Sequence, residues 1–214
     1  TSDTEAKRIL LMGLTHEENL NLARNIRDSE LILGVISRLE KAENEKNASI
    51  LESDSIEKYS ELVEILGPDI NNQTVYVGSK VNGSSKGSLF NSEKDLYSYF
   101  LTSTKDKNGV ISHVLQVKVE YTSDNWRNYA SVSLCDKWRC NEDEKIDILI
   151  VSIVANGCSS SSCKYTESLK FVLGKEQINK NMSSDLIFRI NSDNGSNKIL
   201  VSSAYLKASI QVIK

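Results

Sequence analysis

The sequence from Cys135 to Cys163 reads CDKWRCNEDEKIDILIVSIVANGCSSSSC and holds all four cysteines of the chain, as two pairs with the same spacing. An even number of cysteines grouped around turns is typical of disulfides formed in an oxidising compartment. The β-branched run 146–155 between the pairs predicts a strand about 30 Å long, at roughly 3.3 Å per residue. Because the Cα atoms of a disulfide lie within about 7 Å of each other, we expect two local bridges, Cys135–Cys140 and Cys158–Cys163.

Two other interpretations of the cysteines stay open. A four-cysteine zinc site prefers ligands that are closer in sequence, and it would need both cysteine loops to converge on one ion. Four reduced cysteines would instead place the protein in a cytosol, where disulfides rarely persist. The disulfide interpretation predicts a periplasmic or extracellular protein.

Membrane attachment is expected only through a lipid, if at all. No run of about 18 or more apolar residues occurs, so we expect no membrane span. No signal peptide is recognisable, and an exported chain would have lost its leader before Thr1. A lipid-modified cysteine upstream of Thr1 would be compatible with an anchor.

Charge and periodicity both change near Pro68. Residues 1–68 carry 14 acidic and 8 basic side chains, a net charge of −6, whereas residues 69–214 carry 15 and 18, a net charge of +3. Apolar residues recur at helical spacing before Pro68 and alternate after it. We therefore predict an α+β fold, with a helical region at 1–68 and an antiparallel β domain at 69–214.

Three short amphipathic helices are predicted in the first part. Thr15-His16-Glu17-Glu18 has the form of a capping box. The second helix is capped by Asp28 or Ser29 and places apolar residues from Ile32 to Leu39 on one face. This face packs against the other helices or the β part, or alternatively it binds a partner or a second copy of the chain. The helices are expected at 15–27, from 28 or 29 to about 47, and from 54 or 55 to Gly67-Pro68.

The second part predicts successive hairpins, and hence an antiparallel sheet or a sandwich with a closing helix. Run 146–155 is apolar on both faces and should therefore be a central strand. Residues 78–88 form a Gly/Ser-rich loop, residues 174–181 a short helix, and Ser202 caps a helix to 212. The strands are expected at 74–77, 96–102, 110–121, 126–134, 146–155, 165–173, 186–190 and 197–201.

One serine motif suggests an enzyme. Gly83-Ser84-Ser85-Lys86-Gly87 matches G-x-S-x-G, but a nucleophile elbow needs a strand-to-helix turn and a histidine within reach. The downstream histidine, His113, falls in the middle of a predicted strand. A serine hydrolase that uses Ser85 is therefore the alternative function and not the leading one.

Cofactor and metal chemistry has little support in the sequence. The chain has two histidines, His16 and His113, and no glycine-punctuated calcium loop. The small basic excess of the β part forms no stripe, so we expect no nucleic acid as a partner. We expect neither catalytic residues nor metal nor cofactor.

The best candidates for a binding surface lie at Trp126-Arg127-Asn128-Tyr129. On a strand, Trp126 and Asn128 would share one face, with Arg127 and Tyr129 on the other. An arginine beside a tyrosine on a solvent-facing strand can anchor a protein or glycan contact, although simple cross-strand packing is the alternative. We therefore predict a binding surface at Arg127 and Tyr129.

Three stretches of the β part carry a resemblance to known proteins. They are residues 126–129, the Cys158 to Cys163 loop with residues 164–168 after it, and Val201-Ser202-Ser203-Ala204-Tyr205-Leu206. From about Leu96 to Val212 the chain resembles a loosely defined group of uncharacterised bacterial envelope proteins and lipoproteins. The resemblance implies export and a β-rich domain; it brings no active site, substrate or cofactor, and it leaves out residues 1–68 and the Cys135/Cys140 pair.

The predicted function is binding without catalysis. We expect an exported envelope or secreted protein whose partner is another such protein. One variant is an immunity-type or inhibitor protein that covers a partner's site with an acidic helical face. Partner identity and oligomeric state do not follow from the sequence.

Overall fold

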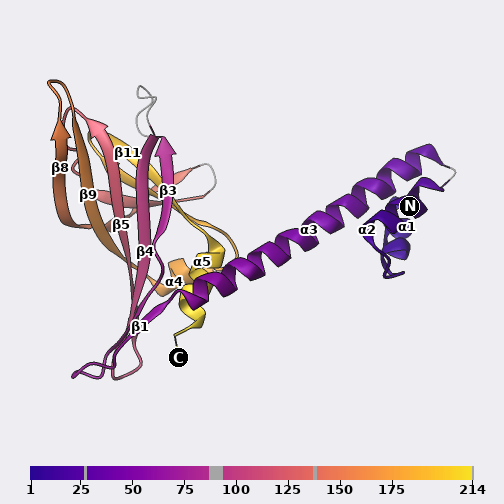
Figure 1. Ribbon diagram of the computed structural model, residues 1–214, viewed down its shortest axis with the longest axis horizontal. Helices are drawn as coiled ribbons and strands as arrows, with labels where there is room; N and C mark the ends of the chain where they lie inside the picture. The colour runs from indigo at the N-terminus through magenta and orange to yellow at the C-terminus, as the bar shows by residue number, and fades with distance from the viewer. Residues whose placement is uncertain (27, 87–93, 137–138, 214) are drawn as a thin grey trace. The chain divides into compact units, whose positions relative to one another are not determined.

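The computed structural model describes residues 1–26, 28–86, 94–136 and 139–213, with the backbone alone at 29, 86, 94 and 142–144. The chain forms two compact units, Thr1–Asp54 and Ser55–Lys214, and the division falls inside helix α3 (Figure 1). An α+β fold with two antiparallel sheets is thus confirmed.

The first unit is a small helical cluster. It contains α1 (Ser2–Leu10), α2 (His16–Arg24) and the first part of α3 (Ser29–Glu61). The predicted capping box forms, with Thr15 N–H donating to Glu18 Oε2 over 2.9 Å and Glu18 N–H donating to Thr15 Oγ1 over 3.3 Å. The apolar face of α3 is covered by α1 and α2, through a buried core of Ala6, Ile9, Ala23, Val35 and Leu39.

Helix α3 corrects two of the helix predictions. It continues for 33 residues to Glu61, where we expected two separate helices. The charged stretch 43–54 contains neither glycine nor proline, so nothing in it ends a helix. Instead of reaching Gly67, the helix ends early, because residues 64–66 form strand β1 and pair with β2 (Thr74–Val77).

The larger sheet of the second unit has the order β1-β2-β4-β5-β9-β8, and β3 pairs with β4 further along the same edge as β2. Every second residue of β5 from His113 to Tyr121 is buried, as the period of a half-buried strand requires. Its strands are β1 (Glu64–Leu66), β2 (Thr74–Val77), β3 (Val81–Lys86), β4 (Lys94–Lys105), β5 (Ile111–Ser123), β8 (Leu149–Cys158) and β9 (Cys163–Leu173).

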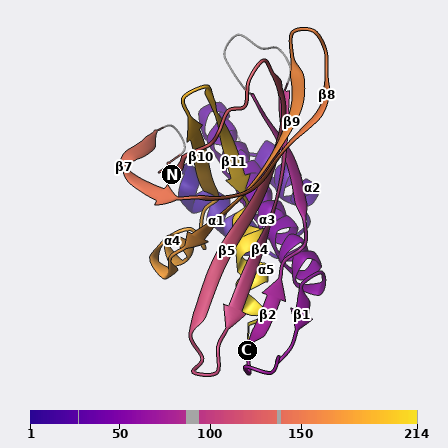
Figure 2. The same cartoon turned by 90° about the vertical axis from the view of Figure 1, so that its left-hand side faces the viewer.

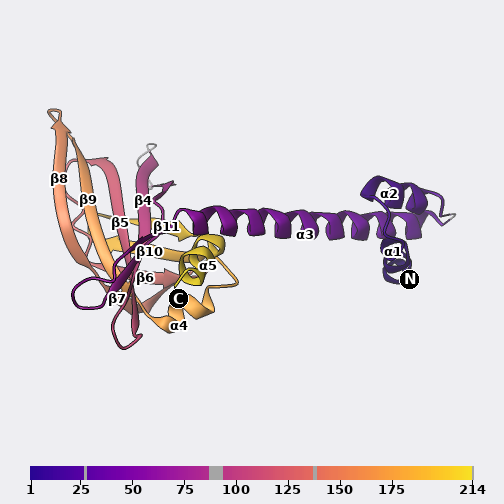
Figure 3. The same ribbon diagram turned by 60° about the horizontal axis from the view of Figure 1, so that its bottom comes forward.

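The smaller sheet has the order β11-β10-β6-β7 and shares one core with the larger sheet. Figure 2 shows it on one face of the long strands together with α5, and Figure 3 shows β10 and β6 running across β4 and β5. Phe171 of the large sheet meets Phe188 of the small one edge-to-face, with ring centroids 5.1 Å apart. The remaining elements are β6 (Ser131–Cys135), β7 (Cys140–Asp147), α4 (Lys175–Lys180), β10 (Leu186–Ser192), β11 (Gly195–Val201) and α5 (Ser203–Gln211).

Helix α5 closes the core at one end. Ser202 Oγ accepts from Tyr205 N–H, which confirms the predicted cap. The fully buried ring of Tyr205 packs edge-on against Tyr99 and Tyr59, each at 5.3 Å between centroids. Its hydroxyl accepts from Leu101 N–H over 2.9 Å and donates to Ser79 O over 3.0 Å, so the helix is bonded to the sheet as well as packed on it.

Both local disulfides form, Cys135–Cys140 and Cys158–Cys163, and each closes a hairpin between paired strands. The run 146–155 is nevertheless not one strand. Its first residues end β7 in the small sheet, and the chain then enters the large sheet as β8. The prediction that this run is central is wrong, because β8 lies at the edge of the large sheet.

Two predicted loop and strand boundaries also change. The Gly/Ser-rich segment forms strand β3 against β4 over Val81–Lys86, while residues 87–88 of the predicted loop lie outside the described residues. The expected strand 126–134 begins only at Ser131. Asn128 has a φ of 54°, a left-handed conformation that a strand does not accommodate.

Candidate functional site

Arg127 and Tyr129 are buried, so the prediction that they face solvent is wrong. Their exposed fractions are 4% and 1%. The predicted alternation of 126–129 is kept, but the side with Arg127 and Tyr129 faces the core instead of solvent. Arg127 and Tyr129 enter the space between the two sheets, and Trp126 and Asn128 are exposed instead.

Arg127 is the centre of a buried polar cluster. Its Nη1 donates to Asp95 Oδ2 over 2.5 Å, and its Nη2 donates to Asp95 Oδ1 over 3.3 Å. Asn197 of β11 accepts from Arg127 Nη1 over 2.8 Å and donates its amide to Asp95 Oδ2 over 2.8 Å. The cluster therefore ties β4 of the large sheet to β11 of the small one.

The phenols next to this cluster stay protonated. Burial raises the pKa of Tyr129 above its ordinary value, and burial does the same to Tyr121. Burial by itself lowers the pKa of Arg127, but the hydrogen bond to Asp95 and contacts with Tyr129 outweigh it and raise that pKa. At neutral pH the cluster thus keeps one cation and two donating hydroxyls.

Glu167 holds the backbone of the same segment. This carboxylate of β9 is fully buried and accepts from Asn128 N–H over 3.2 Å and Tyr129 N–H over 3.4 Å. Tyr121 donates its hydroxyl to Glu167 Oε1, and its oxygen accepts from Arg127 N–H over 2.8 Å. Three consecutive backbone N–H groups are therefore bonded to buried side chains, which fixes the loop at residues 127–129.

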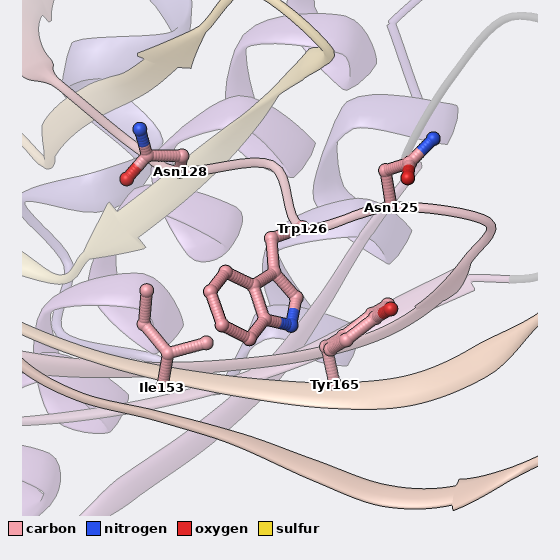
Figure 4. Close-up of a pocket in the computed structure, with 5 residues that line it drawn as sticks. All are labelled: Asn125, Trp126, Asn128, Ile153 and Tyr165. Carbon is pink, nitrogen blue, oxygen red and sulfur yellow. The ribbon is translucent and has the colours of Figure 1, made fainter.

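The fixed loop lines a surface hollow of about 520 Å³ (Figure 4). Trp126 exposes 51% of its surface there, and its indole meets Tyr165 edge-to-face at 6.3 Å. Asn194 donates to the carbonyl of Trp126 over 3.2 Å and holds it from the side of the small sheet. The hollow is lined by Asn125, Trp126, Asn128, Ile153 and Tyr165.

Strand β8 borders this hollow through Ile153 and forms a second candidate surface. Leu149, Val151 and Val154 expose 58%, 56% and 46% of their surfaces. Within the described residues, β9 is the only strand that pairs with β8. The apolar strand therefore has one open backbone edge and several uncovered side chains.

The structure does not bring Ser85 and His113 together. Ser85 pairs with Asp95 across the β3–β4 ladder, and His113 pairs with Ser103 eight residues further along β4, about 26 Å away at 3.3 Å per residue. The Ser85 hydroxyl accepts from the Asn197 amide over 2.7 Å. His113 Nδ1 instead lies 2.7 Å from Ser103 Oγ, and both residues are buried.

Residues 1–26, 28–86, 94–136 and 139–213 contain neither a cluster of metal-ligating side chains nor a helix able to span a membrane. No three histidine, cysteine, aspartate or glutamate side chains gather there in a way that could hold a metal ion. None of the helices in this part of the chain is both long enough and apolar enough to cross a bilayer.

Comparison with known proteins gave no match, whether to family models, to curated proteins or to solved structures. The resemblance to bacterial envelope proteins stays a prediction. The two disulfides are compatible with a secreted or periplasmic protein. A functional hypothesis must therefore rest on the two surfaces, the hollow at Trp126 and the edge of β8.

Proposed function

We propose that this chain is an exported bacterial protein, periplasmic or extracellular, that acts by binding another envelope or secreted protein along strand β8. The observation that supports the proposal is a mismatch between the composition of β8 and its place in the sheet. Its sequence, LIVSIVANGC, is that of a strand buried on both faces, yet it forms an edge.

Edge strands normally carry features that prevent further pairing. Charged residues and prolines are the commonest of these features. Strand β7, at the edge of the small sheet, follows this rule with five charged residues in CNEDEKID. Strand β8 has no charged residue and no proline over its ten positions. The molecule therefore places charge on the edge strand β7, whereas the edge strand β8 carries no charge over its whole length.

The open edge suits an extended segment of a partner that adds a strand to the sheet. Main-chain hydrogen bonds provide affinity in such complexes, and side-chain contacts provide specificity. The register with β9 shifts between Ile150 and Ser152 and again after Ala155, so residues 152–155 form a regular stretch between the two shifts. The Cys158–Cys163 disulfide closes the hairpin and keeps β8 attached to β9 when a partner pairs with it.

The apolar side chains add a measurable share of the affinity. Covering a half-exposed valine or leucine is worth about 1 kcal/mol, roughly half the value for full burial. Leu149, Val151 and Val154 together would thus contribute about 3 kcal/mol, which is a factor of about 100 in Kd.

Photo-crosslinking in the native envelope fraction tests the proposal. A photoreactive amino acid replaces Val154, and in a control protein it replaces Val172, which is 61% exposed on β9, where it pairs with Val114 of β5 and lies beyond the ladder between β8 and β9. We expect one defined adduct from position 154 and none from position 172. Equal adducts from both positions, or an adduct of the chain with itself, would contradict a dedicated partner at β8.

Affinity for the purified partner gives the quantitative check. Val151→Lys places a charge on the open edge and should weaken binding at least about fivefold, the share of one covered valine. Val172→Lys places the same charge on β9, beyond the ladder between β8 and β9, and should leave Kd unchanged. Wild-type affinity in the Val151→Lys variant would show that β8 is not the contact.

A further inference from the structure

The hollow at Trp126 is lined by groups that carry no charge. We propose that it binds a neutral saccharide unit. Its five lining residues are two asparagines, a tryptophan, an isoleucine and a tyrosine. A phosphate or carboxylate ligand is held best by a cationic lining, and a metal ion by carboxylates or imidazoles. A neutral molecule with one apolar face and several hydroxyls fits this lining.

Trp126 provides the surface for the apolar face of a sugar ring. The π face of an indole is electron-rich and attracts the polarised C–H groups that a pyranose presents on one side. The indole is half exposed, while its edge-to-face contact with Tyr165, which lies beside it in Figure 4, keeps the ring in place. Tyr165 itself is 7% exposed, so the hollow has one accessible stacking surface.

Asn125 and Asn128 provide the hydrogen bonds. Figure 4 shows their amides on either side of the indole. Within the part of the chain that the structure describes, neither side-chain amide has a hydrogen-bond partner, and both are exposed. Each amide has two donors and one acceptor oxygen, the combination that recognises a pair of neighbouring hydroxyls.

The loop that carries these groups is fixed before any ligand binds. Glu167 and Tyr121 bond three consecutive N–H groups of residues 127–129, and Asn194 bonds the carbonyl of Trp126. Asn128 is held in a left-handed conformation that residues other than glycine adopt infrequently. Because the loop is already ordered, ligand binding costs little conformational entropy. More of the contact energy then contributes to affinity, even in a shallow site.

A proline-rich peptide is the main competing occupant. Such peptides dock in grooves lined by several aromatic rings, each of which holds one turn of the polyproline helix. The hollow has one accessible ring flanked by amides, which favours the saccharide. With a single stacking surface, we expect a Kd on the order of a millimolar for one sugar and tighter binding for an oligomer.

The test follows the indole N–H resonance of Trp126 by NMR in the full-length purified chain. A Trp138→Phe background leaves this indole as the one observed. The probes are cellotriose, maltotriose and tri-N-acetylchitotriose, with inorganic phosphate, glucuronate and a deca-proline peptide as competitors of other classes. We expect at least one neutral trisaccharide to shift the resonance saturably, and the charged probes and the peptide to leave it in place.

Two variants assign the contacts. Asn128→Gly keeps the left-handed backbone but removes the amide, so it should weaken binding five- to tenfold without loss of the fold. Replacement of Asn125 by alanine should weaken binding by a similar factor, while Lys198→Ala, on the exposed side of β11, should have no effect. No shift with any of the three trisaccharides, a shift with phosphate or peptide alone, or unchanged affinity in Asn128→Gly would overturn the proposal.

Discussion

Replacement of Arg127 by methionine tests the buried cluster most directly. Arg127 and Asp95 expose 4% and 5% of their surfaces, and the guanidinium donates to both oxygens of the carboxylate. Methionine fills a similar volume but provides no donor. Asp95 would then keep the Asn197 amide as a donor and face a buried environment with its charge unpaired.

The expected cost is large relative to the stability of the unit. Removing one partner of a buried ion pair typically costs about 3–5 kcal/mol, because the other charge stays buried. A second variant, Arg127→Met with Asp95→Leu, removes both charges and should recover at least about 2 kcal/mol of this loss. The double variant is therefore expected to be more stable than the single one, although it lacks more native hydrogen bonds.

Urea unfolding followed by tryptophan fluorescence measures these differences. Both tryptophans, Trp126 and Trp138, belong to the second unit, so the signal reports on the unit that contains the cluster. The slope of free energy against urea should stay the same, which would show that the midpoint change reflects stability. A loss below about 1 kcal/mol in Arg127→Met would refute the reasoning, since it would mean that water reaches the ion pair.

Three other changes have defined outcomes. Burial, followed by the charge of Lys175, lowers the pKa of His113 below its ordinary 6.5, so the unfolded chain binds the proton more strongly than the folded chain. The free energy of unfolding should therefore fall as the pH drops through about 6.5. His113→Gln should reduce this dependence on pH, as measured by urea midpoints between pH 8 and 5. Replacing Cys158 and Cys163 together by alanine should cost about 2 kcal/mol, from the entropy of a short closed loop, and an unchanged midpoint would argue against the bridge. Gly83→Ala should lower the free energy of unfolding by about 1–3 kcal/mol, because the new Cβ would lie 2.4 Å from Cζ of Tyr97. If the segment were a nucleophile elbow, the substitution would instead reduce activity at unchanged stability.

Elements that are marked by a regular alternation or by a capping residue could be predicted from the sequence. Strand β2 (Thr74–Val77) and the capped helix α5 form where the alternation and the serine cap place them. The two disulfides form as predicted, although the strand over 146–155 that was expected to separate the two cysteine pairs is divided between β7 and β8. The unbroken helix α3 was missed because polar residues were interpreted as a boundary, although none of them stops a helix.

The position of β8 and the orientation of residues 126–129 could not be predicted in the same way. Periodicity shows that a segment is a strand, but it does not show which strands lie beside it. An apolar run is therefore the same in a central strand as in an edge strand that binds a partner. At 126–129 the alternation places Trp126 and Asn128 opposite Arg127 and Tyr129, as predicted, but it does not show which side faces solvent, and the exposed pair is Trp126 and Asn128.

The alternation of anchored and exposed side chains at 126–129 gives a last prediction, on hydrogen exchange. Trp126 and Asn128 point outward, and Arg127 and Tyr129 point inward, so the exposed residues cannot move without breaking buried hydrogen bonds. The amide hydrogens of 127–129 should then exchange at the slow rate of the core strand β5, although they lie in a loop.

Glu167→Gln provides the matching perturbation. The variant keeps the shape of the side chain but replaces one acceptor oxygen by a donor, so the amides of Asn128 and Tyr129 should exchange at least about tenfold faster, equivalent to about 1.4 kcal/mol. The amide of Leu115, on a core strand, serves as the control and should change only with global stability. Fast exchange at residues 127–129 in the unaltered protein would mean that the loop opens freely, and the surface hollow at Trp126 would then lack the fixed geometry on which saccharide binding depends.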